Sequence, residues 1–239
     1  MEDVHWWFVG RRRILLTILN RYIGAGTQGG RRILDVGCGT GTMLIYLARF
    51  GNAQGVDIDE EAIEYCHARG LTQVSQSAAD SLPFSNDTFE LVTVLDVIEH
   101  IDDDVGVLRE VRRVLRPGGR LLVTVPAYMF LWGRQDRVNL HKRRYVAPEL
   151  RKRLQSAGFE VERLTYLNAF MFPAIAAIRL ISRLLPAPAE NTSDFAFPAP
   201  RPLNAVLSAV FGSERYILSR LNIPFGVSIM ALARKPVDQ

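Results

Sequence analysis

The chain has 239 residues, of which 48% are hydrophobic and 23% charged, a composition that excludes a disordered protein and fits one globular domain. Its two cysteines exclude a disulfide framework or a cysteine metal cluster, so we predict no metal site and expect a reducing, cytoplasmic location. The net charge of +4 is modest, and no nucleic-acid-binding motif accompanies it, so we do not expect a nucleic-acid partner.

Segments typical of helices and strands alternate along the first two thirds of the chain. Residues 5–22 are aromatic and basic and predict a helix packed over the cofactor side. Short apolar runs predict buried strands at 32–36, 53–58, 72–76, 89–95 and 120–125. Segments with helical spacing separate these runs, at 42–50, 60–69 and 104–115. This alternation predicts an α/β fold with a doubly wound, mostly parallel sheet and helices on both faces.

The last third is less regular. It predicts a helix at 148–157, a strand at 159–166, an apolar helix at 169–185, a proline-rich loop at 186–202, a helix at 203–221 and a final strand at 226–233. Arg179, Arg183 and a proline interrupt the apolar helix before it reaches the length needed to cross a bilayer. We therefore expect it to lie on a surface or cover a pocket.

The glycine-rich turn Asp35-Val36-Gly37-Cys38-Gly39-Thr40-Gly41 follows the first strand and precedes a helix. Glycines allow a ligand to approach the backbone closely, and the start of a helix presents unpaired N–H groups. A dinucleotide-binding loop would need glycine or alanine where this chain has Thr42. Asp35 also suits a ligand with an ammonium group better than one with a pyrophosphate.

Five further motifs follow this turn in a fixed order. The six are Ile33–Gly41, Gly55–Ile58, Ala79–Phe84, Phe89–Val92, Val97–Ile101 and Leu115–Gly119. Together they resemble the class I S-adenosylmethionine (SAM)-dependent methyltransferases, specifically the small-molecule enzymes that include ubiquinone and menaquinone methyltransferases. The resemblance implies a Rossmann-like seven-stranded sheet of order 3-2-1-4-5-7-6 with an antiparallel last strand.

It also divides the single domain, residues 1–239, into five parts. These are an N-terminal helical cover (1–30), a SAM-binding core (31–126), an acceptor-side loop, helix and strand (127–168), a helical insertion or lid (169–225), and the last strand with the tail (226–239).

The resemblance also implies which residues bind SAM and its product, S-adenosylhomocysteine. Asp35 and the turn Gly37-Cys38-Gly39 would hold the methionine part, and the backbone carbonyl of Asp96 would lie beside it. Asp57 would accept hydrogen bonds from the ribose, and Ile58 would pack on the adenine. Asp80 would accept from the adenine amine, and the Ala79 N–H would reach a ring nitrogen. The alternative for Asp57 and Asp80 is capping of nearby helices.

An oxygen or nitrogen acceptor requires a base, for which histidine is the usual residue. His141, with Tyr145 behind it, and His100 follow strands at the edge where ligands bind, so these three are the catalytic candidates. The alternatives are a loop anchor for His141 and a structural or cofactor-side role for His100.

We expect methyl transfer to a small hydrophobic or anionic acceptor, at oxygen, with nitrogen and carbon left open. A catalytically silent SAM-binding regulator and an NAD-dependent oxidoreductase are the alternative functions.

Two surface features bear on the acceptor and on partners. Residues 134–153 hold eight Lys or Arg against two acids, a local charge of +6, which fits a basic rim for an anionic acceptor or lipid headgroups, or a solvated surface. Apolar side chains at Trp6–Phe8 and 169–185 predict a lid over an apolar acceptor. We expect residues 1–22 and 169–225 together to build this acceptor-side cover and to contribute little to cofactor recognition. A homodimer interface or a peripheral membrane contact would use the same side chains.

Overall fold

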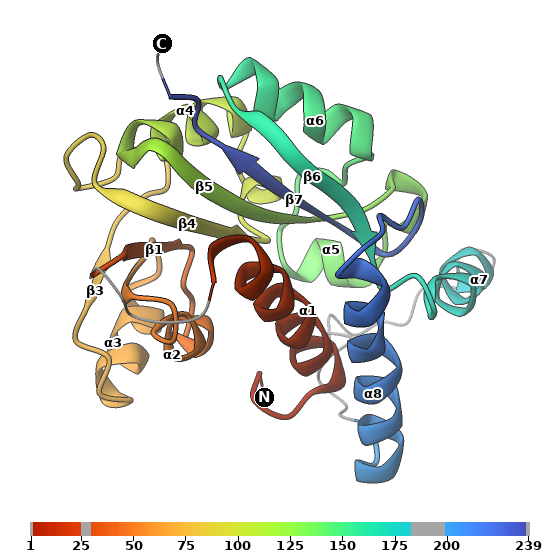
Figure 1. The fold of residues 1–239 in the computed structure, drawn as a ribbon. Coiled ribbons are helices and arrows are strands. Elements are labelled where there is room, and N and C mark those ends of the chain that lie inside the picture. The colour runs from red at the N-terminus through yellow and green to blue at the C-terminus, as the bar shows by residue number, and fades with distance from the viewer. Residues whose placement is uncertain (1, 25–29, 183–198, 238–239) are drawn as a thin grey trace.

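The computed structural model describes residues 2–24, 30–182 and 199–237, and these residues form one seven-stranded sheet (Figure 1). The strands are β1 (Arg32–Val36), β2 (Asn52–Asp57), β3 (Val74–Gln76), β4 (Phe89–Leu95), β5 (Leu115–Pro126), β6 (Glu160–Leu167) and β7 (Ser228–Arg234). Their order is β3-β2-β1-β4-β5-β7-β6; β1 to β5 run parallel, and β7 runs antiparallel to both of its neighbours. The predicted fold class and strand order are confirmed.

Helices fill the connections between the strands. They are α1 (Trp6–Ile23), α2 (Thr42–Leu47), α3 (Glu60–Ala68), α4 (Asp104–Val114), α5 (Arg134–Val138), α6 (Ala147–Ser156), α7 (Phe172–Ser182) and α8 (Arg201–Leu218), with short 3-10 helices η1 (Ile98–His100) and η2 (Met129–Leu131). Helix α5 has only five residues, too few to show the periodic spacing of apolar residues that indicates a helix. The sequence therefore did not predict it. Most of the predicted loop 186–202 lies outside the described residues.

The start of β5 differs from the prediction. The proline and glycines at 117–119 were expected to precede the strand, which instead begins at Leu115. Leu115 pairs with Phe89, and pairing resumes between Arg120 and Leu91 after a shift in register. The turn residues therefore form an irregularity inside the strand.

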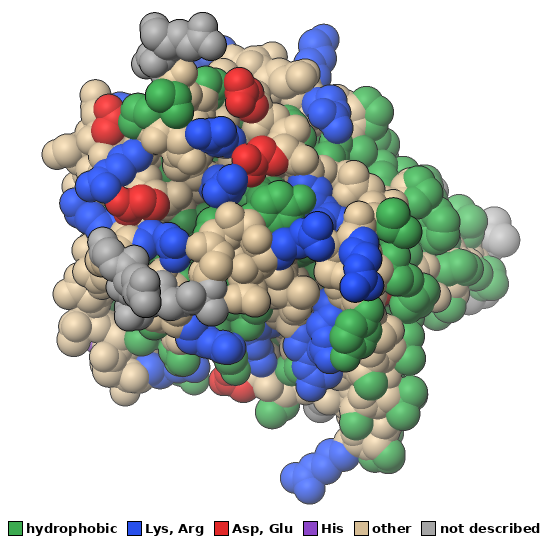
Figure 2. Space-filling view, viewed as in Figure 1, with side chains coloured by type: hydrophobic (Ala, Val, Ile, Leu, Met, Phe, Trp, Pro, Cys, Tyr) green, Lys and Arg blue, Asp and Glu red, His purple; other side chains and the backbone are tan. Residues whose placement is uncertain are grey.

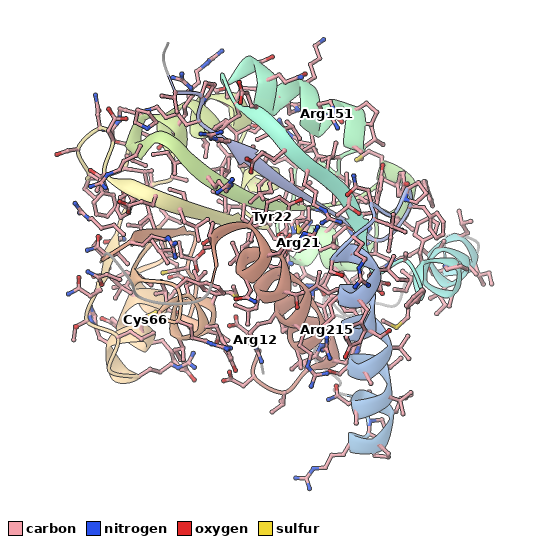
Figure 3. All side chains as sticks on the ribbon, viewed as in Figure 1. Arg12, Arg21, Tyr22, Cys66, Arg151 and Arg215 are labelled. Atoms are coloured by element: carbon pink, nitrogen blue, oxygen red, sulfur yellow. The ribbon has the colours of Figure 1, made fainter. Side chains whose placement is uncertain are left out.

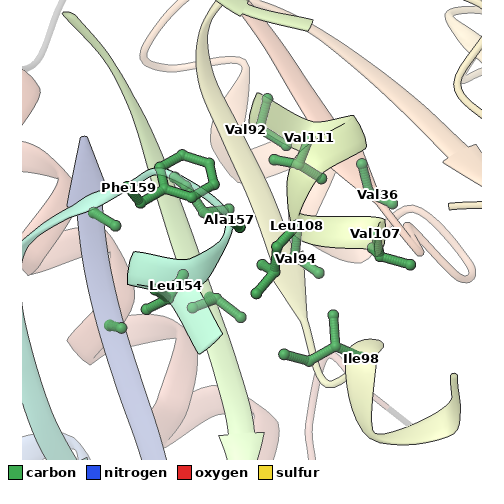
Figure 4. Close-up of a cluster of buried hydrophobic side chains, with 14 of the residues drawn as sticks. Val36, Val92, Val94, Ile98, Val107, Leu108, Val111, Leu154, Ala157 and Phe159 are labelled. Atoms are coloured by element: carbon green, nitrogen blue, oxygen red, sulfur yellow. The ribbon is translucent and has the colours of Figure 1, made fainter. Parts of the chain in front are cut away.

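Helices cover both faces of the sheet, and the side chains of β4 point alternately to one face and the other. Val92 and Val94 join the cluster under α4 and α6, which Figure 4 shows with Leu108 and Leu154. Leu91, by contrast, joins a second cluster on the opposite face, where α1 and α8 pack. Side chains one residue apart in a strand point to opposite faces of the sheet. Because helices cover both faces here, β4 has apolar side chains on both.

Helices α1 and α8 pack side by side although they are far apart in the sequence (Figure 1). The buried ring of Phe211 on α8 lies 5.4 Å from the ring of Trp7 and 6.3 Å from that of Trp6, centroid to centroid. A Cβ atom at Gly10 would lie 2.6 Å from the Phe211 ring, so glycine lets the two helices approach this closely. Phe211 therefore anchors α8 on the N-terminal helix.

Helix α7 is apolar but makes no such contact with the core. None of its residues, all of which are described, is buried, and Ile178 and Ile181 are more than half exposed. Hydrophobic side chains gather at the edge of the molecule formed by α7 and the adjoining end of α8 (Figure 2). Of the helices described, none has the length and apolarity that crossing a membrane requires.

We predict that Phe211→Ala lowers the free energy of unfolding by about 3–5 kcal/mol, because it removes a buried aromatic ring between two helices that cannot collapse onto the gap. Val206→Ala, on the same helix but 58% exposed, is the matched control and should change stability by less than about 0.5 kcal/mol. Urea unfolding followed by circular dichroism measures both. Equal effects of the two substitutions would contradict the packing described for α1 and α8.

Candidate cofactor and acceptor site

A cavity of about 630 Å³ lies beside the carboxyl ends of β1, β4 and β5. This is the edge of a doubly wound sheet at which ligands bind. Its wall combines residues of the glycine turn, the end of β4 with η1, the N-terminal segment, the α5 region and α7. Those used below are Asp35, Gly37, Cys38, Gly39, Asp96, Glu99, His100, His141, Arg144, Glu2, Trp7, Phe8, Arg11, Ile175 and Ile178.

The glycine turn is held by β2 and opens toward this cavity. The N–H groups of Gly37 and Cys38 both donate to the carbonyl of Val56, at 2.8 and 3.0 Å. Gly37 and Gly39 have φ values of +72° and +51°, in the left-handed region that favours glycine. A Cβ atom at Gly37 would lie 2.3 Å from Val97, whereas one at Gly39 would meet nothing within 4 Å. Gly39 therefore leaves open space in which a ligand can touch the backbone.

Asp35 supplies a buried carboxyl group at the start of this turn. It is 2% exposed and accepts a hydrogen bond of 2.5 Å from the Thr93 hydroxyl. Burial raises the pKa of Asp35 to about 7, and the opposing effects of Thr93 and Arg11 offset only part of that shift. Because a cation would favour the ionised form, the site suits the ammonium group of a ligand. The neighbouring Cys38 stays a thiol at neutral pH, since burial raises its pKa as well.

The N-terminal segment contacts both sides of this turn. Arg11 of α1 forms an ion pair with Asp96 at the end of β4, which also accepts from the Thr124 hydroxyl at 3.0 Å. Glu2 accepts a hydrogen bond of 3.1 Å from the Thr40 hydroxyl. These contacts place the N-terminal segment against residues expected to bind the cofactor.

Four of the predicted cofactor residues are not on the cavity wall. Asp57 ends β2, and its carboxylate accepts from the Gly39 N–H at 2.7 Å. Ile58 is 70% exposed, and Ala79 and Asp80 follow β3. The structure thus brings Asp35, Gly37, Cys38, Gly39 and Asp96 together on the wall, holds Asp57 against the glycine turn, and leaves Ile58, Ala79 and Asp80 off the wall.

The α5 region places His141 on the opposite wall. Its Nδ1 lies 2.9 Å from a carboxylate oxygen of Asp136, which is fully buried. Arg144 and the Gly133 N–H also donate to this carboxylate, at 2.8 and 2.7 Å. Burial would raise the pKa of Asp136, but the hydrogen bonds from His141 and Arg144 outweigh it and lower the pKa to about 2. Asp136 is therefore ionised at neutral pH and fixes the His141 ring.

Two residues of η1 complete a cluster with His141. The His100 and His141 rings meet edge to face with centroids 4.8 Å apart. Burial, followed by the nearby His141, lowers the pKa of His100, so the ring is neutral at pH 7. Glu99 is fully buried, and burial raises its pKa to about 8.

Tyr145 does not line the cavity. It is fully buried, and its hydroxyl donates to Asp104 at 2.8 Å rather than reaching the cavity wall. Burial is the first cause that raises its pKa, and the hydrogen bond to Asp104 adds to it. Tyr145 therefore anchors the loop between α5 and α6, and the expectation of a catalytic role is corrected.

At least four of the eight basic residues in segment 134–153 form ion pairs with acids. Arg144 lines the cavity but is bound to Asp136, Arg143 and Arg153 both pair with Asp104, and Lys142 pairs with Asp102. Arg151 is exposed on α6, on the opposite side of the sheet from α1 (Figure 3). These pairs reduce the positive charge that the segment offers to an anionic acceptor.

Similarity to known proteins agrees with this geometry. A family described as "Methyltransferase domain" matches residues 34–123. A probable S-adenosylmethionine-dependent methyltransferase of Mycolicibacterium smegmatis is 36% identical over 168 residues, 68% of this chain and 62% of the relative. A ubiquinone biosynthesis O-methyltransferase of Methylococcus capsulatus is 35% identical, over 48% of this chain and 53% of the relative.

Solved structures share the fold. A SAM-dependent methyltransferase from Archaeoglobus fulgidus has a TM-score of 0.58 and 21% identity, covering 94% of each chain. The [4+2]-cyclase SpnF has a TM-score of 0.59 and 25% identity, covering 96% of this chain and 81% of its own.

Residues 34–123 form a methyltransferase domain of the class I SAM-dependent type. The chain spans less than two thirds of the length of the curated relatives named above.

The cofactor of this family is SAM, and the residues present fit it. Gly39 leaves the backbone open to the cavity, and Asp35 offers a buried carboxyl group for an ammonium group. Asp57 offers a carboxylate at the end of β2, where the resemblance expects the ribose.

Sequence reasoning missed two residues that shape the site. Arg11 reaches Asp96 across 85 positions of the chain, and nothing in its local pattern indicates this contact. Asp136 lies in a segment in which basic residues predominate, and no pattern in the sequence indicates that this carboxylate is buried.

We predict that S-adenosylhomocysteine binds about tenfold more weakly at pH 6 than at pH 8, because below pH 7 most of Asp35 is protonated and binding of an ammonium group requires the ionised form. Isothermal titration calorimetry across this range measures the affinity. Asp35→Asn is the control, which should bind weakly and lose the pH dependence. A wild-type affinity that does not change between pH 6 and 8 would place the ligand's ammonium group elsewhere.

We also predict that Asp57→Ala weakens S-adenosylhomocysteine binding by about 1–3 kcal/mol, the cost of losing hydrogen bonds to a charged group. Asp59→Ala is the matched control, because Asp59 caps the start of α3 and does not line the cavity. Calorimetry measures the affinity of both variants for S-adenosylhomocysteine, and circular dichroism checks that each is folded. Unchanged affinity in folded Asp57→Ala would remove Asp57 from the ribose site.

Proposed function

We propose that this protein transfers the methyl group of SAM to an oxygen atom of a small hydrophobic acceptor. The observation that carries the proposal is that one cavity is lined both by the glycine turn with Asp35 and Asp96 and by the cluster Glu99, His100 and His141. A cofactor on the glycine turn and an acceptor beside the cluster would share this one cavity. The whole cavity of about 630 Å³ has the size of a small-molecule site.

Apolar side chains support the choice of a hydrophobic acceptor. Trp7 and Phe8 from α1 and Ile175 and Ile178 from α7 line the cavity. Apolar walls exclude water and leave the few polar groups to orient the acceptor. Relatives named for O-methylation, the ubiquinone biosynthesis enzymes and a 27-O-demethylrifamycin SV methyltransferase of Amycolatopsis mediterranei, support oxygen as the acceptor atom.

Exposed apolar side chains on α7 and α8 would serve a partner as well as a cover. Leu203 and Val206 of α8 are at least half exposed, as are Ile178 and Ile181 of α7. A second copy of the chain or a membrane surface would contact these side chains.

SAM supplies an electrophilic methyl group when bound. The chain's own residues therefore need to align the acceptor and promote the loss of the proton from its hydroxyl. The Glu99, His100 and His141 cluster is the polar group that faces the acceptor side. Asp136 keeps His141 in one orientation through the 2.9 Å contact with Nδ1, which leaves Nε2 for the acceptor. We therefore propose that this cluster activates the acceptor hydroxyl. The new C–O bond forms as the C–S bond breaks, and S-adenosylhomocysteine leaves.

We predict that His141→Asn lowers methyl transfer by about 10²–10⁴-fold, the usual contribution of a group that manages a proton, while affinity for S-adenosylhomocysteine stays within about twofold. The measurement is methyl transfer from radiolabelled SAM to a library of phenols and other hydroxylated apolar compounds. His67→Asn, on the exposed face of α3, is the matched control and should keep full turnover.

Three results would contradict the proposed function. Wild-type protein that binds S-adenosylhomocysteine but methylates no member of the library would favour a silent SAM-binding regulator. Binding of NAD in place of S-adenosylhomocysteine would favour an oxidoreductase. Full turnover by His141→Asn would remove the histidine cluster from the reaction.

A further inference from the structure

We propose that Glu99, His100 and His141 bind one divalent transition-metal cation on the acceptor side of the cavity. This inference rests on the proposed function and deepens it, because it states how the cluster activates the acceptor oxygen. Four observations carry it: the spacing of the three donors, the groups that orient the two rings, the environment of the carboxylate and the chemistry of the donor set.

The three side chains converge on one point. One donor atom from each, a ring nitrogen of His100, a ring nitrogen of His141 and a carboxylate oxygen of Glu99, all lie within 4.8 Å of one another. Donors bound to the same ion at about 2.0–2.2 Å are separated by at most about 4.4 Å. Side-chain movements below about 1 Å would therefore bring all three into coordination.

Both histidine rings contact neighbouring groups of the protein on the side away from the proposed cation, as metal-bound histidines usually do. His141 Nδ1 contacts the buried carboxylate of Asp136 at 2.9 Å, which directs the other ring nitrogen away from Asp136. The His100 ring lies near the backbone of Asn139 and Leu140 and packs edge to face on His141. The Asp136 carboxylate therefore orients His141, and the fold holds His100 against it.

Glu99 has no partner that accounts for its burial. Both of its carboxylate oxygens are inaccessible to solvent, and among the described residues no donor from another residue forms a hydrogen bond with either. The nearest cationic side chains are already paired, Arg11 with Asp96 and Arg144 with Asp136. A buried carboxylate without a hydrogen-bonded partner is costly, and coordination of a cation removes that cost.

The donor set selects the type of cation. Two imidazoles and one carboxylate suit zinc, iron, cobalt, nickel or manganese better than magnesium or calcium, which prefer oxygen ligands throughout. Three protein ligands leave coordination positions open to the cavity, where an acceptor oxygen can bind.

A bound cation would lower the pKa of the acceptor hydroxyl, so that its proton leaves to solvent and the oxygen keeps the electron pair that attacks the methyl carbon. His141 then acts as a ligand, and the electrons of the broken C–S bond remain on sulfur.

The proposal departs from the sequence analysis, which predicted no metal site. Glu99 and His100 are neighbours, but His141 follows 41 positions after His100, beyond any spacing that defines a metal motif. The contact of the two rings is a product of the fold, because His141 follows α5 and is anchored there by Asp136.

The test is a titration of metal-stripped, full-length protein with Co²⁺, followed by visible absorption and by calorimetry. Wild type should bind one Co²⁺ per chain, with d–d bands typical of nitrogen and oxygen donors. Glu99→Gln and His141→Asn should each weaken binding by more than about 100-fold, and Asp136→Asn by about 10–100-fold, as expected for a residue behind the ligand. His67→Asn, which removes a surface histidine, should bind as wild type does. Thermal melting and affinity for S-adenosylhomocysteine show that each variant is folded.

The outcomes separate this inference from the proposed function. The metal site is disproved if wild type binds no Co²⁺, or if the folded variants bind it as wild type does. If His141→Asn then still loses methyl transfer, the proposed function stands and the cluster moves the proton directly. If wild type binds Co²⁺ through these residues but transfers no methyl group, the site stands and the proposed function fails.

Discussion

The pairing of β1 with both β2 and β4 is the constraint on which the site depends. Because the three strands run parallel, their carboxyl ends meet at one edge of the sheet. The chain leaves β1 through the glycine turn toward α2 and leaves β4 through Asp96 toward η1. Asp35 and Asp96 therefore face a common crevice, and the cofactor wall follows from strand order alone.

The elements around the sheet edge depend on charges held in ion pairs. Arg11, Asp96, Asp136 and Arg144 are held in ion pairs around the cavity, and Asp136 is fully enclosed. Removing one partner of a buried pair is costly, because the remaining charge loses its compensation. These pairs therefore fix the positions of α1 and of the α5 region relative to the sheet, and with them the position of His141.

The sheet and the cofactor wall could be predicted because each depends on local patterns. The apolar run of β4 and the acidic residue before the glycine turn are both visible in short segments. The acceptor wall could not be predicted in this way. The Arg11–Asp96 pair joins residues 85 positions apart, and α5 has only five residues. Tyr145 follows His141 closely in the sequence, but the fold turns its hydroxyl toward Asp104 in the core.

The contact between α1 and α8 has a consequence for biosynthesis. The backbone N–H of Trp6 donates to the side chain of Asn204, 198 residues later, at 2.8 Å. During translation, α1 emerges first, whereas the helix against which it packs emerges only after β6 is complete. Contacts between such distant segments form slowly, because a long loop of chain must be closed. A nascent chain that has been synthesised as far as β5 thus contains the glycine turn. Its N-terminal aromatic residues have nothing to pack against yet, because α8 has not been synthesised.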